Sequence, residues 1–268
     1  MPIYTCEDMI RDCRAGKTEG WSYFVQQYVP VVRRLVDHYY PERAGDTDLS
    51  ARVLQTLGKP DLPLFVASGP LSERDFVADL RQFVLGAIEE DSASDEAEIS
   101  VDVETLASAL ESLSTIEKQV AWLEAMRYGA DETAHMMAMH ASTVANIRER
   151  AAELLRSRVS AWQAGMIAAN GPALRREAVL LGKDDCPSAH VWLDWLDGRI
   201  TWYQREDAER RLAACWHCID HFCRLREAQS LLRELKPLTA AEAEPFRRAL
   251  GLPATEGSRW KRLFASRP

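Results

Sequence analysis

The sequence lacks the features of several common protein classes. It has no apolar run near the ~20 residues that a membrane-spanning helix needs. Its opening, Met1-Pro2-Ile3-Tyr4, lacks the basic and apolar regions of a secretory signal peptide. No Ser-His-Asp grouping, phosphate-binding loop or paired-carboxylate motif is evident, so an enzyme is poorly supported. We therefore expect a cytoplasmic protein without membrane contact, which binds other molecules rather than transforming them.

Positive charge is also scarce. The chain has 33 lysines and arginines against 41 aspartates and glutamates, and its formal net charge is −8. This balance excludes a protein coated in phosphate-binding residues, although a local basic patch can still act within an acidic whole. Any DNA contact must therefore be local.

Cysteine is sparse, and its placement matters more than its number. The six cysteines are poor candidates for structural disulfides in the cytosol, where thiols are kept reduced. Most of the cysteines and half of the histidines fall in one late segment. They are Cys186, Cys215, Cys218 and Cys223, with His190, His217 and His221. This clustering raises a metal-binding hypothesis.

The alternation typical of β-strands is absent, and apolar residues recur at the three- and four-residue steps of helices. The 268 residues allow two or three small domains. Helices are predicted through a first domain at 1-90, and a run rich in acidic residues at 91-104 predicts a solvated linker. We expect an all-α protein.

The clearest pattern lies in a second domain at 105-160. A helix that ends near Met126 is followed by a short helix from Asp131 to Met137, a turn, and a longer helix from Ser142 to about Val159. These are the proportions of a helix-turn-helix. Beyond it we expect a linker helix at 161-182, a small helical module at 183-230 and a helical tail at 231-268.

Two stretches near the start contain recognisable sequence motifs, AGKTEGWSYF at 15-24 and YVPVVRRL at 28-35. They resemble the turn, aromatic helix and Tyr-x-Pro segment at the start of extracytoplasmic-function sigma factors, members of the sigma-seventy family. Asp48 and Leu49 match the beginning of the helix with which that family grips RNA polymerase, and Arg52 lies in the same helix. The resemblance implies a sigma-factor-like four-helix domain that binds core RNA polymerase through these three residues.

The second domain resembles the family's helix-turn-helix. The matching landmarks are Glu132, Ala134, Thr143, Val144, Arg150 and Ala151. The resemblance implies promoter binding, with polar and basic side chains facing the DNA. The implied DNA contacts are Ser142, Thr143, Asn146, Arg148, Arg150 and Arg156. The alternative is that the arginines form a solvated helix face, paired with Glu149 and Glu153.

The late segment resembles the zinc-binding anti-sigma domain. It contains Cys186, the turn Leu196-Asp197-Gly198, and Cys215-Trp216-His217-Cys218, but Arg211 stands where that domain has a histidine. A guanidinium cannot serve as a zinc ligand. The predicted site therefore joins Cys186, Cys215 and Cys218 to a fourth ligand, His190 or His221. The alternative is a metal-free module in which the cysteines pack as small apolar residues.

These resemblances together imply a sigma-like transcription initiation factor whose C-terminal module regulates it. Its implied partners are core RNA polymerase, promoter DNA, and an anti-sigma or other regulatory protein. Two aromatic segments are further candidates for a partner surface, with core packing as the alternative: Trp202-Tyr203 and Trp260-Lys261-Arg262-Leu263-Phe264.

A second hypothesis keeps the fold and removes the DNA contact. The family opens DNA strands with a basic run, but this chain has the acidic Glu89-Glu90-Asp91 at that place. Ala145 and Ile147 also stand where the family usually has basic residues. These losses favour a sigma-like adaptor or inhibitor that acts through protein contacts.

Overall fold

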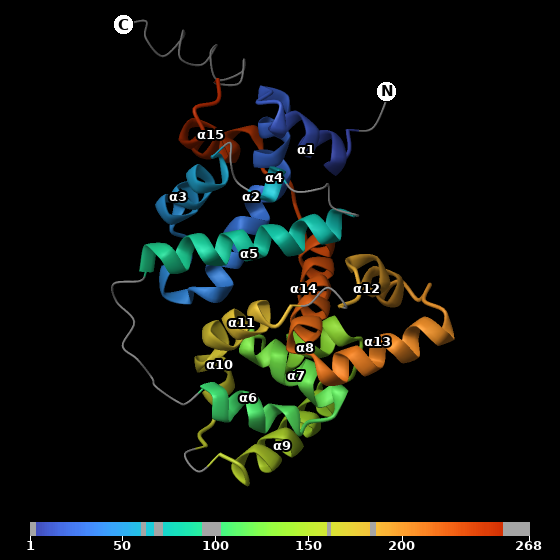
Figure 1. Ribbon diagram of the computed structural model, residues 1–268. Coiled ribbons are helices and arrows are strands. Elements are labelled where there is room, and N and C mark those ends of the chain that lie inside the picture. Colours follow the sequence, from blue (N-terminus) through green and yellow to red (C-terminus); the bar gives the residue numbers. More distant parts are fainter. Residues whose placement is uncertain are drawn as a thin grey trace, which may run out of the picture. The chain divides into compact units, whose positions relative to one another are not determined.

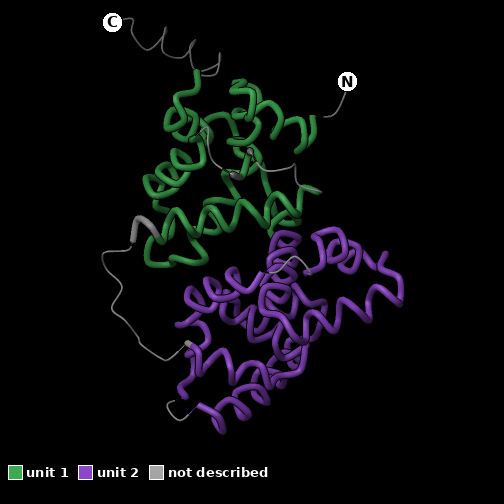
Figure 2. The backbone as a smooth tube through the Cα atoms, in the orientation of Figure 1, with its two compact units in different colours: residues 1–95, 231–268 green, residues 96–230 purple. Residues whose placement is uncertain are grey.

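All regular secondary structure in the described residues is helical (Figure 1). The computed structural model describes residues 4–59, 63–66, 72–92, 103–159, 162–182 and 186–253. The prediction of an all-α protein is confirmed for these ranges. Figure 2 shows the two compact units, Met1–Asp95 with Leu231–Pro268, and Glu96–Ser230. Most of the predicted acidic linker, residues 93–102, lies outside the described residues.

The first unit is built from long helices around an aromatic centre. Its elements are α1 (Cys6–Arg14), α2 (Thr18–Tyr39), the 3-10 turn η1 (Pro41–Arg43), α3 (Thr47–Leu57), α4 (Pro63–Val66), α5 (Glu73–Ser92) and α15 (Ala240–Ala249). The rings of Phe24, Tyr28, Phe65 and Phe76 pack with centroids 5.0 to 6.4 Å apart. This cluster joins α2, α4 and α5 into one core.

Two polar groups in this core are satisfied internally. The hydroxyl of Tyr28 donates to Glu73 Oε1 at 2.7 Å, and the buried guanidinium of Arg81 donates to the hydroxyl of Tyr39 at 2.7 Å. Burial raises the pKa of Tyr28 well above its usual range. Both hydrogen bonds join α2 to α5, and they fix how the two helices pack.

The predicted C-terminal tail belongs to this unit. Helix α15 packs against α2 and α3. The backbone N–H of Leu238 donates to the carbonyl of Gln26 at 2.9 Å, and Arg34 forms an ion pair with Glu234. The chain therefore returns to the first unit after passing through the second, a non-local contact that helical periodicity does not reveal.

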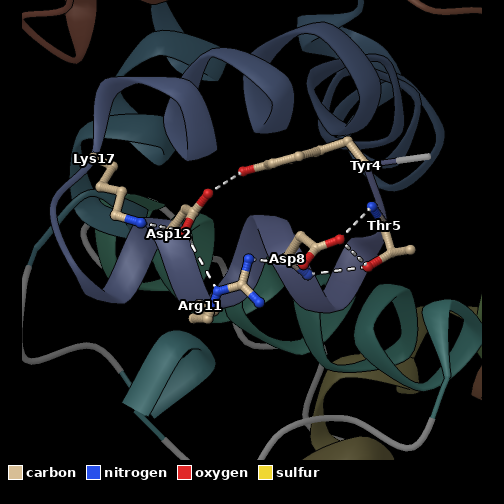
Figure 3. A network of polar contacts seen from close by, with 6 residues as sticks. All are labelled: Tyr4, Thr5, Asp8, Arg11, Asp12 and Lys17. Carbon is tan, nitrogen blue, oxygen red and sulfur yellow. Dashed lines mark hydrogen bonds and ion pairs between the residues drawn. The ribbon is translucent and has the colours of Figure 1, made fainter. Parts of the chain in front are cut away.

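The residues with the sigma-like motifs, 15–24 and 28–35, form a turn and most of α2, and α2 packs against α1 as a helical hairpin (Figure 3). Thr5 and Asp8 make a capping box that starts α1. Asp12 accepts from Tyr4 at 2.9 Å and pairs with Lys17 at 2.9 Å, which ties the turn to the helix. At Gly20 an added Cβ would lie 2.7 Å from the backbone nitrogen of Cys13, so the crossing requires glycine.

The second unit surrounds the nearly buried helix α7. Its elements are α6 (Val103–Glu111), α7 (Thr115–Ala125), α8 (Ala130–Met137), α9 (Ala141–Arg156), α10 (Met166–Ala169), α11 (Gly171–Leu180), α12 (Ala189–Leu196), α13 (Trp202–Ala214) and most of α14 (Trp216–Arg233). Helices α8, α9, α10, α11 and α13 all contact α7. The domains expected separately at 105-160 and 183-230 thus lie in one compact unit.

No helix among the described residues is long and apolar enough to cross a membrane.

The two helical glycines Gly20 and Gly86 make a matched test of the α1–α2 hairpin. Gly20→Ala should destabilise the first unit by about 1–3 kcal/mol, because the methyl group overlaps backbone atoms of α1. Gly86→Ala should stabilise it by about 0.5–1 kcal/mol, because Gly86 in α5 is exposed and a Cβ there meets nothing within 4 Å. Urea unfolding followed by circular dichroism measures both. Equal shifts in one direction would contradict the packing described.

Candidate functional site

Helices α8 and α9 form a close pair joined by residues 138–140. The carboxylate of Glu132 accepts from the backbone N–H of Gly129 at 3.0 Å and caps the start of α8. Ala138 ends α8 in the left-handed region, with φ 52°. The side chains of Ala134 and Val144 are buried, as small residues at a close crossing should be. The two helices have the lengths and the short turn that the sequence predicts.

Helix α9 has one apolar face and one polar face. Val144, Ile147, Ala151 and Leu155 are buried at three- and four-residue steps. The remaining face is exposed and carries five of the six predicted DNA-contacting residues. They are Ser142, Thr143, Asn146, Arg150 and Arg156. Glu149 and Glu153 lie among them on exposed positions.

Arg148, the sixth predicted DNA contact, is directed into the unit. Its guanidinium donates to the carbonyl of Tyr128 at 2.6 Å and to the hydroxyl of Thr133 at 3.2 Å. It also lies 3.7 Å from the carboxylate of Glu124, whose pKa is raised by burial and lowered in part by Arg148. Arg148 therefore joins α9 to α7 and α8 and is not presented for a phosphate.

Arg150 remains exposed but has a partner within the chain. It donates to Glu117 Oε1 at 2.7 Å. Hydrogen bonds from Ser114 and then from Arg150 hold the pKa of Glu117 below its usual range. A nucleic acid that engaged Arg150 would have to compete with this surface ion pair, which typically contributes ~0–1 kcal/mol.

The three residues predicted to bind polymerase lie on α3. Asp48 and Arg52 are exposed, whereas Leu49 is 1% exposed and belongs to the core of the first unit. In this conformation only Asp48 and Arg52 can meet a partner. The side chain of Leu49 instead fixes α3 against its neighbours.

The late cysteines form a compact cluster with one histidine. One ligand atom each from Cys186, His217 and Cys218 lie within 4.8 Å of one another, and this group could bind a metal ion. The Sγ atoms of Cys186 and Cys215 are 3.9 Å apart. Burial, followed by the neighbouring thiols of Cys215 and Cys186, raises the pKa of Cys218 far above its usual value.

His217 is the donor that sequence reasoning missed. Its Nδ1 is buried and has no hydrogen-bond partner, and burial lowers its pKa. An unpaired buried nitrogen beside thiols fits a metal ligand, because a buried polar atom normally has a partner. The close approach of Gly182, where a Cβ would lie 3.0 Å from His217 Cδ2, leaves little room around the ring. The sequence feature that could have identified His217 as a ligand is its position between Cys215 and Cys218.

The two histidines proposed as fourth ligands lie apart from this group. His190 is exposed, and its Nε2 is 3.0 Å from Asp194. His221 is half-buried, with its ring centroid 6.2 Å from that of His217 and its pKa lowered to about 3, mainly by desolvation. Within the described ranges the structure groups His217, and neither of these histidines, with Cys186 and Cys218.

The cluster lies beside α7. Trp216 stacks on Trp122 with ring centroids 5.4 Å apart, and the ammonium of Lys118 lies 5.3 Å from the centre of the Trp216 ring. Lys118 Nζ also donates to the carbonyl of Ala213. A cavity of about 260 Å³ adjoins these groups and is bordered by Cys215.

Of the two aromatic segments proposed as partner surfaces, the structure describes only the first. Trp202 and Tyr203, at the start of α13, are each 77% exposed, so they are not core residues of the second unit. The segment from Trp260 to Phe264 lies outside the described residues.

Comparison of the chain with protein-family models, curated proteins and solved structures gave no match. The sigma-factor and anti-sigma resemblances therefore remain predictions from the sequence.

Substitution of single cluster residues tests the metal centre. Cys218→Ser and His217→Gln should each abolish near-stoichiometric uptake of a thiophilic divalent metal, because each removes one donor from the group. His190→Gln is the matched control and should bind metal as the original chain does. Elemental analysis of the purified proteins measures the content. Uptake lost with His190→Gln and kept with His217→Gln would reverse the assignment.

Two arginines on α9 differ in burial and in their partners, and this difference can be tested by measuring stability. Arg148→Ala should lower the free energy of unfolding of the second unit by about 1–3 kcal/mol, because it removes the hydrogen bond to the carbonyl of Tyr128 and the positive charge beside the half-buried Glu124. Arg156→Ala should change it by less than about 0.5 kcal/mol, because Arg156 is exposed. Thermal unfolding distinguishes them. A tolerated Arg148→Ala would return that residue to the candidate DNA contacts.

Proposed function

We propose that the chain is a sigma-like transcription initiation factor that binds promoter DNA through α8–α9 and core RNA polymerase through its first unit. The observation that supports DNA binding by α8–α9 is that α9 has two distinct faces. One face is buried, and the other presents Ser142, Thr143 and Asn146 followed by Arg150 and Arg156. This arrangement suits a recognition helix, whose N-terminal residues contact base edges and whose basic side chains contact phosphates.

The chemistry of duplex binding follows from these residue types. The first turn of α9 carries the exposed hydroxyls of Ser142 and Thr143 at the N-terminal end of the helix dipole, a place that suits a phosphate oxygen. Asn146, one turn further, can pair with the edge of an adenine in the major groove. Arg156 near the end of the helix suits a second phosphate.

The electrostatics predict modest affinity. Glu149 and Glu153 share the exposed positions of α9 with the arginines, and Arg148 is committed to the inside of the unit. Few phosphates can then be neutralised, so binding should depend weakly on salt compared with a strongly basic reader. Attachment to polymerase would supply the missing affinity by holding the second unit near its promoter.

The polymerase contact rests on the sequence resemblance, supported by the exposure of Asp48 and Arg52 on α3. Leu49 takes part by fixing this helix in the core rather than by touching the partner. The two exposed side chains carry opposite charges, which suits a polar contact at the rim of an interface better than a buried one.

The cluster beside α7 would hold a structural zinc ion through Cys186, Cys215, His217 and Cys218. Zinc favours sulfur and imidazole donors, and a site with four protein ligands is closed to water and serves structure. Binding requires deprotonated thiols and a neutral imidazole, and burial already favours the neutral form of His217. The ion would join the segment before α12 to the start of α14.

A second candidate function is a sigma-like adaptor or inhibitor that binds proteins and no DNA. It is favoured by the inward position of Arg148 and by Glu149 and Glu153 on the exposed face of α9. The exposed pair Trp202 and Tyr203 would then be a natural protein-binding surface.

Duplex binding over a range of salt concentrations tests the first candidate against the second. Asn146→Ala should weaken binding to a selected promoter by about 1–3 kcal/mol and relax its sequence preference. Arg156→Ala should weaken binding to all duplexes and reduce the salt slope by about one. Arg205→Ala is the control, because it removes an exposed arginine from α13, outside the helix pair.

Transcription from a supercoiled promoter library with reconstituted core polymerase completes this test. The initiation factor should direct specific transcripts, and Asn146→Ala should lose them. Polymerase binding without salt-sensitive attachment to any duplex, alone or in the complex, would refute the first candidate in favour of the adaptor.

A further inference from the structure

The cluster of cysteines with His217 lies at the start of α14, and the same helix contacts α8 and the loop before it. Cys215 immediately precedes α14, and His217 and Cys218 lie in its first turn. The rest of the helix runs past α7 and the loop that follows it. The cluster is therefore built into the start of the helix that contacts α7.

The contacts nearest the cluster lead directly to α7. Trp216, between two cluster residues, stacks on the fully buried Trp122. Trp122 also donates through Nε1 to Asp220 Oδ1 at 3.1 Å, and Asp220 pairs with Arg224 at 2.9 Å. The first two turns of α14 are thus held to α7 by a stacked ring pair and a buried hydrogen bond.

The contacts further along α14 lead to α8 and α9. Glu227 accepts from the hydroxyl of Tyr128 at 2.6 Å, and the carbonyl of the same Tyr128 accepts from Arg148 of α9 at 2.6 Å. Arg226 donates to the carbonyl of Met136 near the end of α8 at 3.1 Å. A continuous series of hydrogen bonds therefore runs from α14 through Tyr128 to the helix proposed to meet DNA.

The start of α14 contains a buried polar atom that no group of the described residues satisfies. His217 Nδ1 is buried without a partner, and Cys218 is fully buried beside two other thiols. An unsatisfied buried polar atom destabilises the folded state. The free energy of metal binding at a site absent from the unfolded chain is folding free energy, so loading stabilises the elements that the site joins.

We propose that a metal ion bound by Cys186, Cys215, His217 and Cys218 stabilises the folded conformation of α7–α9. The metal-loaded protein then binds its duplex more tightly than the metal-free protein. The second half of this proposal rests on the proposed function, whereas the first half stands on the packing alone. Lost metal loosens the start of α14, and the loss of its contacts with Trp122 and Tyr128 then loosens α7 and α9.

Amide hydrogen exchange of the full chain without DNA tests the first half. The zinc-loaded protein is compared with protein stripped by a chelator. Amides of α7 and α9 should exchange at least about tenfold faster after stripping, a typical magnitude for coupling between two sites. Amides of α2, in the other unit, should not change and serve as the internal control.

A variant pair separates coupling from simple loss of structure. Trp122→Phe combined with Tyr128→Phe removes the two hydrogen bonds to α14 while keeping aromatic rings in place. It should keep stoichiometric zinc and lose most of the zinc effect on α9. Trp195→Phe is the matched control, because Trp195 packs on Phe222 within the cysteine module, and it should keep the full effect.

Duplex affinity in the loaded and stripped states tests the second half. We expect stripping to weaken binding by about tenfold or more in the original chain and by much less in the double variant. Exchange that changes only in α12–α14 on stripping, or a chain that takes up no zinc, would overturn the proposal. Coupled exchange without any duplex binding would refute the proposed function and leave the coupling standing, whereas equal duplex affinity in both states would overturn the regulatory half.

Discussion

The second unit depends on the packing of α14 against α7, and Trp122 is at the centre of that contact. Its ring stacks on Trp216, its Nε1 donates to Asp220, and its surface is 2% exposed. A tryptophan that combines a large apolar contact with a satisfied N–H stabilises a junction strongly and fixes its geometry. Because of this junction, the cysteine cluster and the candidate DNA-binding helices lie in one unit rather than in two.

Local sequence features predicted the helices well. The pattern between 131 and 159 is found as α8 (Ala130–Met137) and α9 (Ala141–Arg156), with boundaries within a few residues. Apolar periodicity identifies the buried face of α9, because its inward residues follow one another at three- and four-residue steps. The exposure of Ser142, Thr143 and Asn146 could be inferred in the same way.

Features that depend on non-local packing could not be predicted. Arg148 and Arg156 are the same residue type on one helix, yet only Arg148 reaches the carbonyl of Tyr128. The sequence favours His190 or His221 over His217 as the fourth ligand, because spacing does not show that His190 is exposed and paired with Asp194 or that His217 lies beside the thiols. The docking of α15 on α2 and α3 likewise joins residues more than 180 apart in the chain, as Leu238 and Gln26 show.

The charge of α9 sets the balance between the two candidate functions. A helix that meets DNA uses basic residues mainly to hold phosphates, and base contacts come from a few polar side chains. This helix keeps the polar side chains and mixes its arginines with Glu149 and Glu153. This mixture suits the proposed role, in which polymerase would supply much of the affinity, better than that of an independent DNA-binding protein.

Site-specific photocross-linking tests the central claim, that the exposed face of α9 meets a duplex, most directly. A photoreactive benzoylphenylalanine placed at position 146 of the metal-loaded chain should cross-link to promoter DNA in the presence of core polymerase, and the product should decrease as salt increases. The same group at position 86, on the exposed side of α5, should not. Cross-links from position 146 that reach only protein would contradict the account.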